Sequence, residues 1–237
     1  MKAIIDIHSH TYASGHAFST LNENIESAIE KGVKVLATTD HAPEMPGGAH
    51  IYHFWNQRAI PEVIKGVRVL KGVEANIINR DGGIDVPEEL LDELEFCIAS
   101  FHPPCFKSGT MTENTDTLLK VMSNCNINVI GHPGDSRYPF DVKTIIDASV
   151  KTHTALEMNN ASLAPFGFRE GGDKVIRNIL DECGVQNCPV VMGSDAHYCS
   201  HIGNFEYVEK LFNEIAFPTE LVLNYDVDRF FEYFGIE

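Results

Sequence analysis

The stretch IIDIHSHT, residues 4–11, is an apolar run that ends in two histidines separated by one residue. Side chains of an extended chain alternate between two faces, so Asp6, His8 and His10 are expected on one side and Ile5 and Ile7 on the other. The isoleucine face is typical of a core, and the histidine face is typical of a polar site. The sequence therefore predicts a strand whose end opens into a functional site.

Similar apolar runs recur along the 237 residues. Segments rich in Val, Ile and Leu give seven expected strands, at residues 3–7, 33–39, 67–73, 95–100, 127–131, 154–158 and 189–193. Helix-like segments lie between them, and this alternation predicts βα units and a mostly parallel sheet. A closed α/β barrel and an open doubly wound sheet both fit the order. A single domain spanning residues 1–237 has the size of a barrel.

Several expected helices are marked by their first residues. Thr20 and Glu23 form an expected capping box for a helix that ends at Gly32. Asp85, Pro87 and Glu88 open a second expected helix, and Asp141 caps a third. A fourth runs from about Asp173 to Gly184, and a short last helix is expected over 226–235.

Metal-binding residue types follow almost every expected strand. Six of the seven runs end in His, Asp or Glu, namely His8 with His10, Asp40 with His41, Glu74, His102, His132, and Asp195 with His197. The carboxyl ends of barrel strands form one ring, whereas an open sheet spreads its strand ends across its width. The pattern therefore favours the barrel.

Imidazole and carboxylate groups gathered in this way are ligands for zinc, manganese or iron. A single histidine is more often a core or surface residue. However, seven of the eleven histidines lie just past an expected strand or, for His16, a few residues beyond one. Crowded ring nitrogens are costly to bury without cations or hydrogen-bond partners, so the sequence indicates a metal centre at the barrel mouth.

The composition excludes several other classes of function. A formal net charge of −16, from 18 basic and 34 acidic side chains, argues against a nucleic-acid partner. The six cysteines contain no C-x-x-C pair, and no signal peptide or membrane-spanning run is visible. We therefore expect a reduced, cytoplasmic protein without a membrane partner. Bound cations can reverse the charge locally, so a small phosphorylated metabolite remains a candidate substrate.

Six motifs in chain order, DIHSHT, TTDH, GVE, SFH, GHP and GSDAH, resemble those of the PHP (polymerase and histidinol phosphatase) family, and in particular its small stand-alone phosphatases. Each motif alone is weak, but six in order, one at each strand end, are specific. The resemblance spans essentially the whole chain. It implies a distorted seven-stranded (βα)7 TIM-like barrel.

The resemblance also implies nine metal ligands: His8, His10, His16, His41, Glu74, His102, His132, Asp195 and His197. By resemblance, His8, His10 and Asp195 bind one divalent ion. His102 and His132 bind a second ion, and Glu74 bridges the two. His16, His41 and His197 bind a third. Zinc is the first expectation, with Mn²⁺ or Fe²⁺ as alternatives, and the inclusion of His16 rests on the resemblance alone.

Such a centre predicts hydrolysis of small phosphate monoesters by a metal-bound hydroxide at a trinuclear site. Divalent ions lower the pKa of bound water and stabilise in-line displacement at phosphorus. Asp195 and His197 are the catalytic candidates, and the general acid stays unassigned. Arg169, after the sixth expected strand, is the candidate phosphate-binding residue, with a solvated loop arginine as the alternative. A homo-oligomer is left open.

Four further residues are expected to support the ligands. Asp6 and Asp40 are candidates to fix imidazole tautomers, although a cap of the following loop is an equal alternative for Asp40. Glu157 and Asn159, at the end of the sixth strand, are expected to form hydrogen bonds inside the barrel mouth.

Other functions stay open at this point. Histidinol-phosphate phosphatase belongs to a branch of the same family that tends to be longer. A non-catalytic metal-binding module usually lacks some of the ligands. Phosphodiester cleavage of nucleic acid needs a basic groove, and amide hydrolysis in related barrels often uses a carboxylated lysine that this sequence does not place.

Overall fold

The computed structural model describes residues 1–165, 167, 169 and 171–236. Among these residues, seven parallel strands follow chain order around one sheet: β1 (Ile5–Asp6), β2 (Val35–Thr38), β4 (Val67–Asn76), β5 (Phe96–Ser100), β6 (Val129–Ile130), β7 (Ala155–Asn159) and β8 (Val190–Gly193). Each strand overlaps one of the seven expected runs. A short strand that the sequence pattern did not predict, β3 (Val63–Ile64), pairs with β4 in the antiparallel direction.

The sheet nearly closes on itself between β1 and β8. Two backbone hydrogen bonds join the segments that follow these strands. The Asp195 N–H donates to the His8 carbonyl at 2.9 Å, and the His10 N–H donates to the Ala196 carbonyl at 2.9 Å. The predicted seven-stranded parallel barrel is therefore confirmed, and its distortion lies at this seam.

The side chain of Asn224 completes the seam toward the amino ends of the two strands. Its amide nitrogen donates to the carbonyls of Ile5 and Met192 at 2.9 and 2.8 Å, and its oxygen accepts from the Met192 N–H at 2.6 Å. One buried amide thus satisfies backbone groups that a continuous ladder would otherwise pair.

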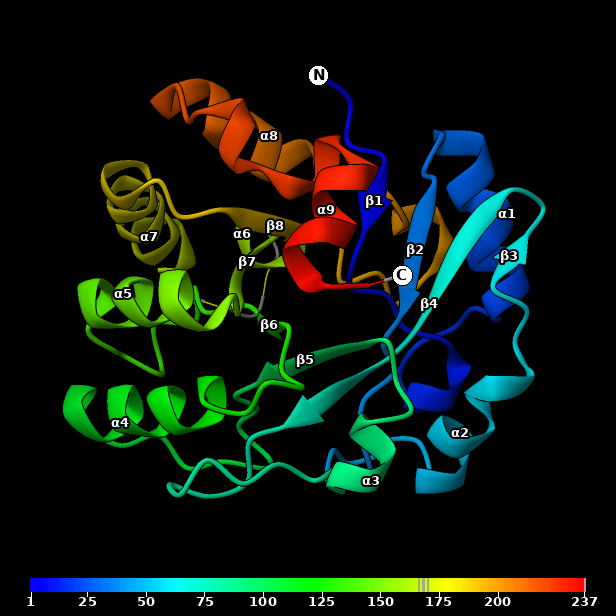
Figure 1. Cartoon of the computed structure of the whole chain (residues 1–237), viewed down its shortest axis with the longest axis horizontal. Coiled ribbons are helices and arrows are strands. Elements are labelled where there is room, and N and C mark those ends of the chain that lie inside the picture. The colour runs from blue at the N-terminus through cyan, green and yellow to red at the C-terminus, as the bar shows by residue number, and fades with distance from the viewer. Residues whose placement is uncertain (166, 168, 170, 237) are drawn as a thin grey trace.

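Helices surround the strands (Figure 1): α1 (Leu21–Lys31), α2 (Ile51–Trp55), α3 (Glu88–Leu91), α4 (Met111–Met122), α5 (Val142–Thr152), α6 (Asn160–Leu163), α7 (Gly172–Gln186), α8 (Glu206–Ile215) and α9 (Val227–Phe234). On one side of the barrel, α5 lies between α4 and α7 and contacts both. In the described part of the chain, every helix is too short or too polar to cross a membrane.

Most expected helix starts are confirmed. The Thr20–Glu23 capping box opens α1, and the Asp141 carboxylate accepts from the Thr144 N–H at the start of α5. The helix expected to open at Asp85, Pro87 and Glu88 is α3, which begins at Glu88 with Pro87 at its N-cap. Asp85 lies before it, and its carboxylate accepts from the Asn76 backbone and side chain. The helices α4 and α8 were not predicted from the sequence.

The end of the barrel opposite the strand carboxyl ends is filled with apolar side chains. Ile5, Val35, Phe96 and Val191 belong to one buried cluster there, together with Phe230 of α9. The rings of Phe96, the first residue of β5, and Phe230 stack with their centroids 5.9 Å apart. The final helix therefore closes this end of the barrel with apolar side chains.

Candidate metal centre

All nine candidate ligands lie at the carboxyl end of the barrel. Glu74 lies within β4, and the remaining eight follow strand ends: His8, His10 and His16 after β1, His41 after β2, His102 after β5, His132 after β6, and Asp195 and His197 after β8. Seven of the nine are buried, whereas His197 is partly exposed and His16 is exposed. The structure thus brings all nine candidate ligands to the same end of the barrel.

Glu74 stands at the middle of the group. Its Oε1 lies 3.2 Å from His102 Nε2 and 2.9 Å from His132 Nε2. Its Oε2 lies 2.7 Å from His41 Nδ1 and 3.3 Å from His8 Nε2. The two carboxylate oxygens therefore face different pairs of imidazoles, which is the arrangement of a carboxylate that bridges two cations.

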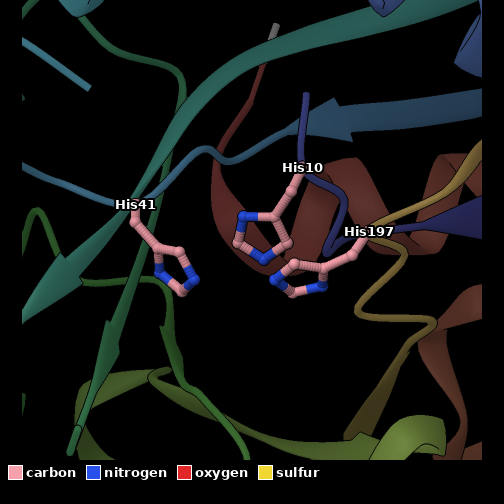
Figure 2. A group of neighbouring side chains, drawn as sticks. All are labelled: His10, His41 and His197. Atoms are coloured by element: carbon pink, nitrogen blue, oxygen red, sulfur yellow. The ribbon is translucent and has the colours of Figure 1, made fainter. Parts of the chain in front are cut away.

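Three histidines from three strand ends form a second group of neighbouring candidate ligands. Figure 2 shows His10, His41 and His197 with their rings turned toward one another. The ring centroid of His10 lies 4.3 Å from that of His41 and 4.2 Å from that of His197. His16 joins this group from outside, with its Nε2 3.1 Å from His197 Nε2. His16, whose inclusion among the ligands depended on the family resemblance alone, therefore lies beside the other candidates.

Asp195 lies between the candidate histidine ligands and the guanidinium of Arg169. Its Oδ1 lies 3.2 Å from His10 Nε2 and 3.7 Å from His8 Nε2. Its Oδ2 lies 3.3 Å from Nη1 of Arg169, which also donates to Ser162 Oγ at 3.1 Å. The side chain of Arg169 is 16% exposed and lies against Asp195, and its role in binding phosphate stays a prediction.

Several buried polar atoms of the cluster have no hydrogen-bond partner. They are His8 Nε2, His10 Nε2, His41 Nδ1 and Glu74 Oε2. Glu74 Oε2 and His41 Nδ1 are 2.7 Å apart, yet their directions do not make a hydrogen bond. Leaving a buried polar group unsatisfied costs about 1–3 kcal/mol each. The three ring nitrogens lie near Glu74 Oε2, an arrangement that ligand atoms around a cation adopt.

Three sets of ligand atoms are close enough to hold an ion, and within each set all atoms lie within 4.8 Å of one another: His10, His41 and His197; His8, His10 and Glu74; and His41, Glu74 and His102. Imidazole nitrogens mixed with carboxylate oxygens suit zinc, manganese or iron. The sets share members, so the division of the nine residues among three ions stays a prediction.

The electrostatics favour the state that binds a cation for Glu74, His132 and His10. Burial opposes the charge of Glu74, but the imidazoles of His8 and His41 outweigh it and hold the pKa of Glu74 well below its usual range. Burial, followed by the nearby Arg169 guanidinium, lowers the pKa of His132 to about 4. Burial and the neighbouring imidazoles also hold the pKa of His10 well below its ordinary value. At neutral pH the carboxylate is ionised, and these two rings are neutral.

His8 differs from the other rings. Burial would lower its pKa, but the carboxylates of Glu157, Glu74 and Asp195 together raise the pKa of His8 well above its ordinary value. The Nδ1 atom of His8 lies 2.8 Å from Glu157 Oε1, and the His132 N–H donates to Glu157 Oε2 at 2.6 Å. The expected hydrogen bonding of Glu157 inside the mouth is confirmed. This contact turns Nε2 of His8 toward the cluster.

Other ring orientations come from residues that the sequence did not single out. His102 Nδ1 lies 2.7 Å from Asn76 Oδ1. Asn76 is two residues after Glu74 on the same strand, so the period-two alternation of β4 was a signal for it. His10 Nδ1 lies 3.2 Å from Ser14 Oγ, which donates to Asp40 Oδ1 at 2.6 Å.

The two aspartates expected to orient imidazoles behave differently from each other. Asp40 acts through Ser14, and its Oδ2 lies 3.1 Å from Nε2 of His53, outside the group of candidate ligands. The prediction for Asp6 is wrong, because its carboxylate accepts from the backbone N–H groups of Ser194 and Gly203 and from that of His8.

Two candidate ligands have strained backbones. His132 has φ 30° and Asp195 has φ 53°, and residues other than glycine are uncommon in this left-handed region. Such conformations persist where surrounding contacts over-determine them and are frequent at functional sites. The turn at each position directs the side chain inward directly after its strand.

The geometry agrees with the family that the chain matches. A family model described as PHP domain matches residues 6–162, which is more than half of the chain and includes the candidate ligands from His8 to His132. The chain belongs to the PHP domain family. Asp195 and His197 of this PHP protein lie beyond the matched residues.

Similar proteins match the PHP protein over almost its whole length. A "Probable phosphatase" of Acetivibrio thermocellus is 43% identical over 233 residues, covering 98% of this chain and 95% of the relative. A probable phosphatase of Clostridium acetobutylicum is 41% identical over 233 residues, with 98% and 95% covered. A crystal structure of histidinol phosphate phosphatase from Lactococcus lactis, complexed with zinc, L-histidinol and phosphate, has a TM-score of 0.62 at 15% identity and covers 92% and 95% of the two chains. This last likeness supports the fold.

Proposed function

We propose that this PHP protein is a metal-dependent phosphatase that hydrolyses small phosphate monoesters. The observation that carries the proposal is the group of fully buried ring nitrogens and one carboxylate oxygen that lack hydrogen-bond partners around Glu74. A divalent cation among them would accept lone pairs from several of these atoms at once. The names of the curated relatives, probable phosphatases at 43% and 41% identity, support the choice of reaction.

The nine residues His8, His10, His16, His41, Glu74, His102, His132, Asp195 and His197 would hold three divalent ions, with zinc as the first expectation and manganese or iron as alternatives. When bound, these ions would supply a water of lowered pKa as nucleophile and would neutralise charge on the phosphoryl oxygens. The donor set fits zinc, because neutral imidazoles and ionised carboxylates are its common ligands.

The residues of the chain would have distinct tasks around the substrate. Glu157 fixes the tautomer of His8 so that Nε2 can ligate. Arg169 would bind the phosphate with its planar fork while it keeps its contact with Asp195. Asp195 and His197 are the catalytic candidates, since Asp195 touches both the imidazoles and the arginine, and His197 has a side chain 29% exposed to entering substrate. The proton donor to the leaving oxygen stays unassigned.

The substrate is expected to be a small phosphorylated metabolite rather than a nucleic acid or a membrane lipid. The excess of 34 acidic over 18 basic side chains argues against a groove that binds a nucleic-acid backbone. We propose a cytoplasmic location for the same chain, and a homo-oligomer stays open.

The decisive experiment combines elemental analysis with a substrate screen on one metal-reconstituted sample. The panel contains phosphate monoesters, histidinol phosphate, phosphate diesters and amides. We expect turnover of several monoesters, its loss on chelation, and its loss in His10→Ala. His153→Ala, which changes a histidine outside the cluster, should keep activity and metal content.

Each alternative function gives its own result in this screen. Turnover of histidinol phosphate alone identifies the specialised branch of the family. Bound metal without turnover of any compound identifies a non-catalytic module. Hydrolysis of diesters alone, or activity that survives complete removal of metal, contradicts the proposal.

A further inference from the structure

One histidine outside the candidate ligands is joined to them by hydrogen bonds. His53 lies on α2, and its side chain is 34% exposed to solvent. Its Nε2 lies 3.1 Å from Oδ2 of Asp40, whose side chain is fully buried. Phe54, the next residue along α2, belongs to a buried apolar cluster and anchors this short helix. His53 therefore extends from the surface to a buried carboxylate.

The carboxylate of Asp40 has two hydrogen-bond partners on each oxygen. Its Oδ1 accepts from the Thr11 N–H at 2.7 Å and from the Ser14 hydroxyl at 2.6 Å. Its Oδ2 accepts from the Thr11 hydroxyl at 2.7 Å and faces Nε2 of His53. A carboxylate surrounded in this way can only accept, so Nε2 of His53 carries a proton and donates it. Thr11 and Ser14 are buried, which makes His53 the donor on the solvent side.

The same hydrogen bonds determine the tautomer of His10. The Ser14 hydroxyl donates its one proton to Asp40 Oδ1, and its oxygen accepts from the His41 N–H at 3.1 Å. Towards Nδ1 of His10, 3.2 Å away, this oxygen can therefore only accept, so Nδ1 carries the proton of the neutral ring. The Nε2 atom of His10 keeps its lone pair, and it lies 3.2 Å from Oδ1 of Asp195 among the candidate ligands.

We propose that His53 is a positioning residue for the candidate metal ligand His10. Its hydrogen bond holds Oδ2 of Asp40, which keeps Oδ1 aimed at the Ser14 hydroxyl. Ser14 then stays an acceptor for Nδ1 of His10. Outer hydrogen bonds that orient a ligating imidazole are part of a metal site, and their loss weakens metal affinity. This inference rests on the proposed metal-dependent function and adds to it a residue that contacts no candidate ligand directly.

Zinc affinity and the ring N–H signal of His10 test this role together. The zinc dissociation constant is measured by competition with a chromophoric chelator, and the Nδ1–H signal of His10 is recorded on the zinc-loaded protein by proton–nitrogen correlation NMR. His53→Ala removes the donor to the carboxylate, whereas His53→Gln keeps an N–H group at the end of the side chain. Ser14→Ala removes the acceptor of His10 itself. His50→Ala is the matched control on the same helix, because His50 Nδ1 caps α2 by accepting from the Tyr52 N–H at 3.2 Å.

We expect the zinc dissociation constant to rise about three- to tenfold in His53→Ala and further in Ser14→Ala. Loss of a group that touches a ligand directly costs about 10–100-fold, and His53 acts through two intervening residues. The Nδ1–H signal of His10 should shift in both variants. His53→Gln and His50→Ala should keep the affinity and the signal of the wild type.

The contrary outcomes are distinct. Wild-type affinity and signal in His53→Ala, beside a loss in Ser14→Ala, overturn the inference. Equal losses in His53→Ala and His50→Ala also overturn it, because they show that only the packing of α2 matters, and a His53→Gln protein as impaired as His53→Ala excludes the N–H as the cause.

The proposed function fails or stands separately. Turnover of monoesters with an unchanged His53→Ala protein leaves the phosphatase intact and removes the positioning role. Weaker zinc binding in His53→Ala, restored in His53→Gln, in a protein without monoester turnover supports the positioning role and contradicts the phosphatase.

Discussion

Replacing Glu157 by glutamine should loosen the metal centre although the side chain keeps its shape. Glu157 is 1% exposed, and both of its oxygens accept hydrogen bonds from groups that need an acceptor. Oε2 accepts from the His132 N–H at 2.6 Å, and Oε1 accepts from Asn159 Nδ2 at 3.1 Å and faces His8 Nδ1 at 2.8 Å. A glutamine must present its amino group at one of these positions.

Either orientation of the new amide is unfavourable. With the amino group at the Oε2 position, the glutamine NH₂ faces the backbone N–H of His132, and this buried N–H loses its acceptor. With the amino group at the Oε1 position, His8 Nδ1 must become the acceptor, so its proton moves to Nε2 and that atom can no longer ligate. Loss of such an outer hydrogen bond weakens metal affinity about 10–100-fold, or about 1.4–2.8 kcal/mol.

The zinc dissociation constants of wild type, Glu157→Gln and the exposed control Glu220→Gln are measured by competition with a chromophoric chelator. We expect the zinc dissociation constant to rise in Glu157→Gln and to equal that of the wild type in Glu220→Gln. Circular dichroism of the apo proteins checks that each variant folds. A Glu157→Gln protein that is folded and binds zinc within about threefold of wild type would refute the role assigned to this carboxylate.

Three further changes test other parts of the structure. Gly193→Ala places a Cβ 1.9 Å from Glu157 Oε1 and 2.7 Å from His8 Cβ, so we expect lower zinc content and a lower Tm, and an unchanged zinc stoichiometry would contradict this. Arg169→Ala should raise KM for a monoester far more than Arg229→Ala, and equal small effects in steady-state kinetics would remove Arg169 from the site. Glu95→Gln tests linkage between protonation and folding: burial would raise the pKa of Glu95, but hydrogen bonds from Arg68 and the Lys71 N–H lower it below 4.5. A carboxyl group whose pKa is lower in the folded state stabilises the fold at pH values above its unfolded pKa. The free energy of unfolding in urea at pH 7 should therefore be larger for the wild type than for Glu95→Gln. That gap should shrink as the pH falls through the folded pKa of Glu95, and a gap that is constant down to about pH 3 would argue against the ion pair.

The position of the metal centre could be predicted because it depends on local rules. Parallel strands end on one side of a barrel, and His10, Glu74 and His132 each follow or occupy the last residues of an apolar run. No long-range information is needed to see that they meet. The capping box of α4, Thr110 with Glu113, was equally local, so that helix was open to prediction from the same signal as α1.

The errors come from contacts that the sequence does not encode locally. Asp6 was expected to orient an imidazole because of its place on the histidine face, but its carboxylate accepts from the backbone N–H of Ser194, 188 positions away in the chain. The closing role of Asn224 is similar, since it lies outside every strand. Such residues satisfy backbone groups that regular structure leaves unpaired, and their partners are set by the finished fold.

The seam between β1 and β8 links the fold to the site. The backbone bonds of Asp195 and His10, the amide of Asn224 and the bond from the Ser194 N–H to Asp6 Oδ1 hold the first strand beside the last. The same seam sets His8 and Asp195 within 3.7 Å of each other at the mouth. His8 and His10, and likewise Asp195 and His197, are two residues apart, so each pair can face the same side of an extended segment. The seam therefore brings the candidate ligands of the first and the last strand together at the mouth of the barrel.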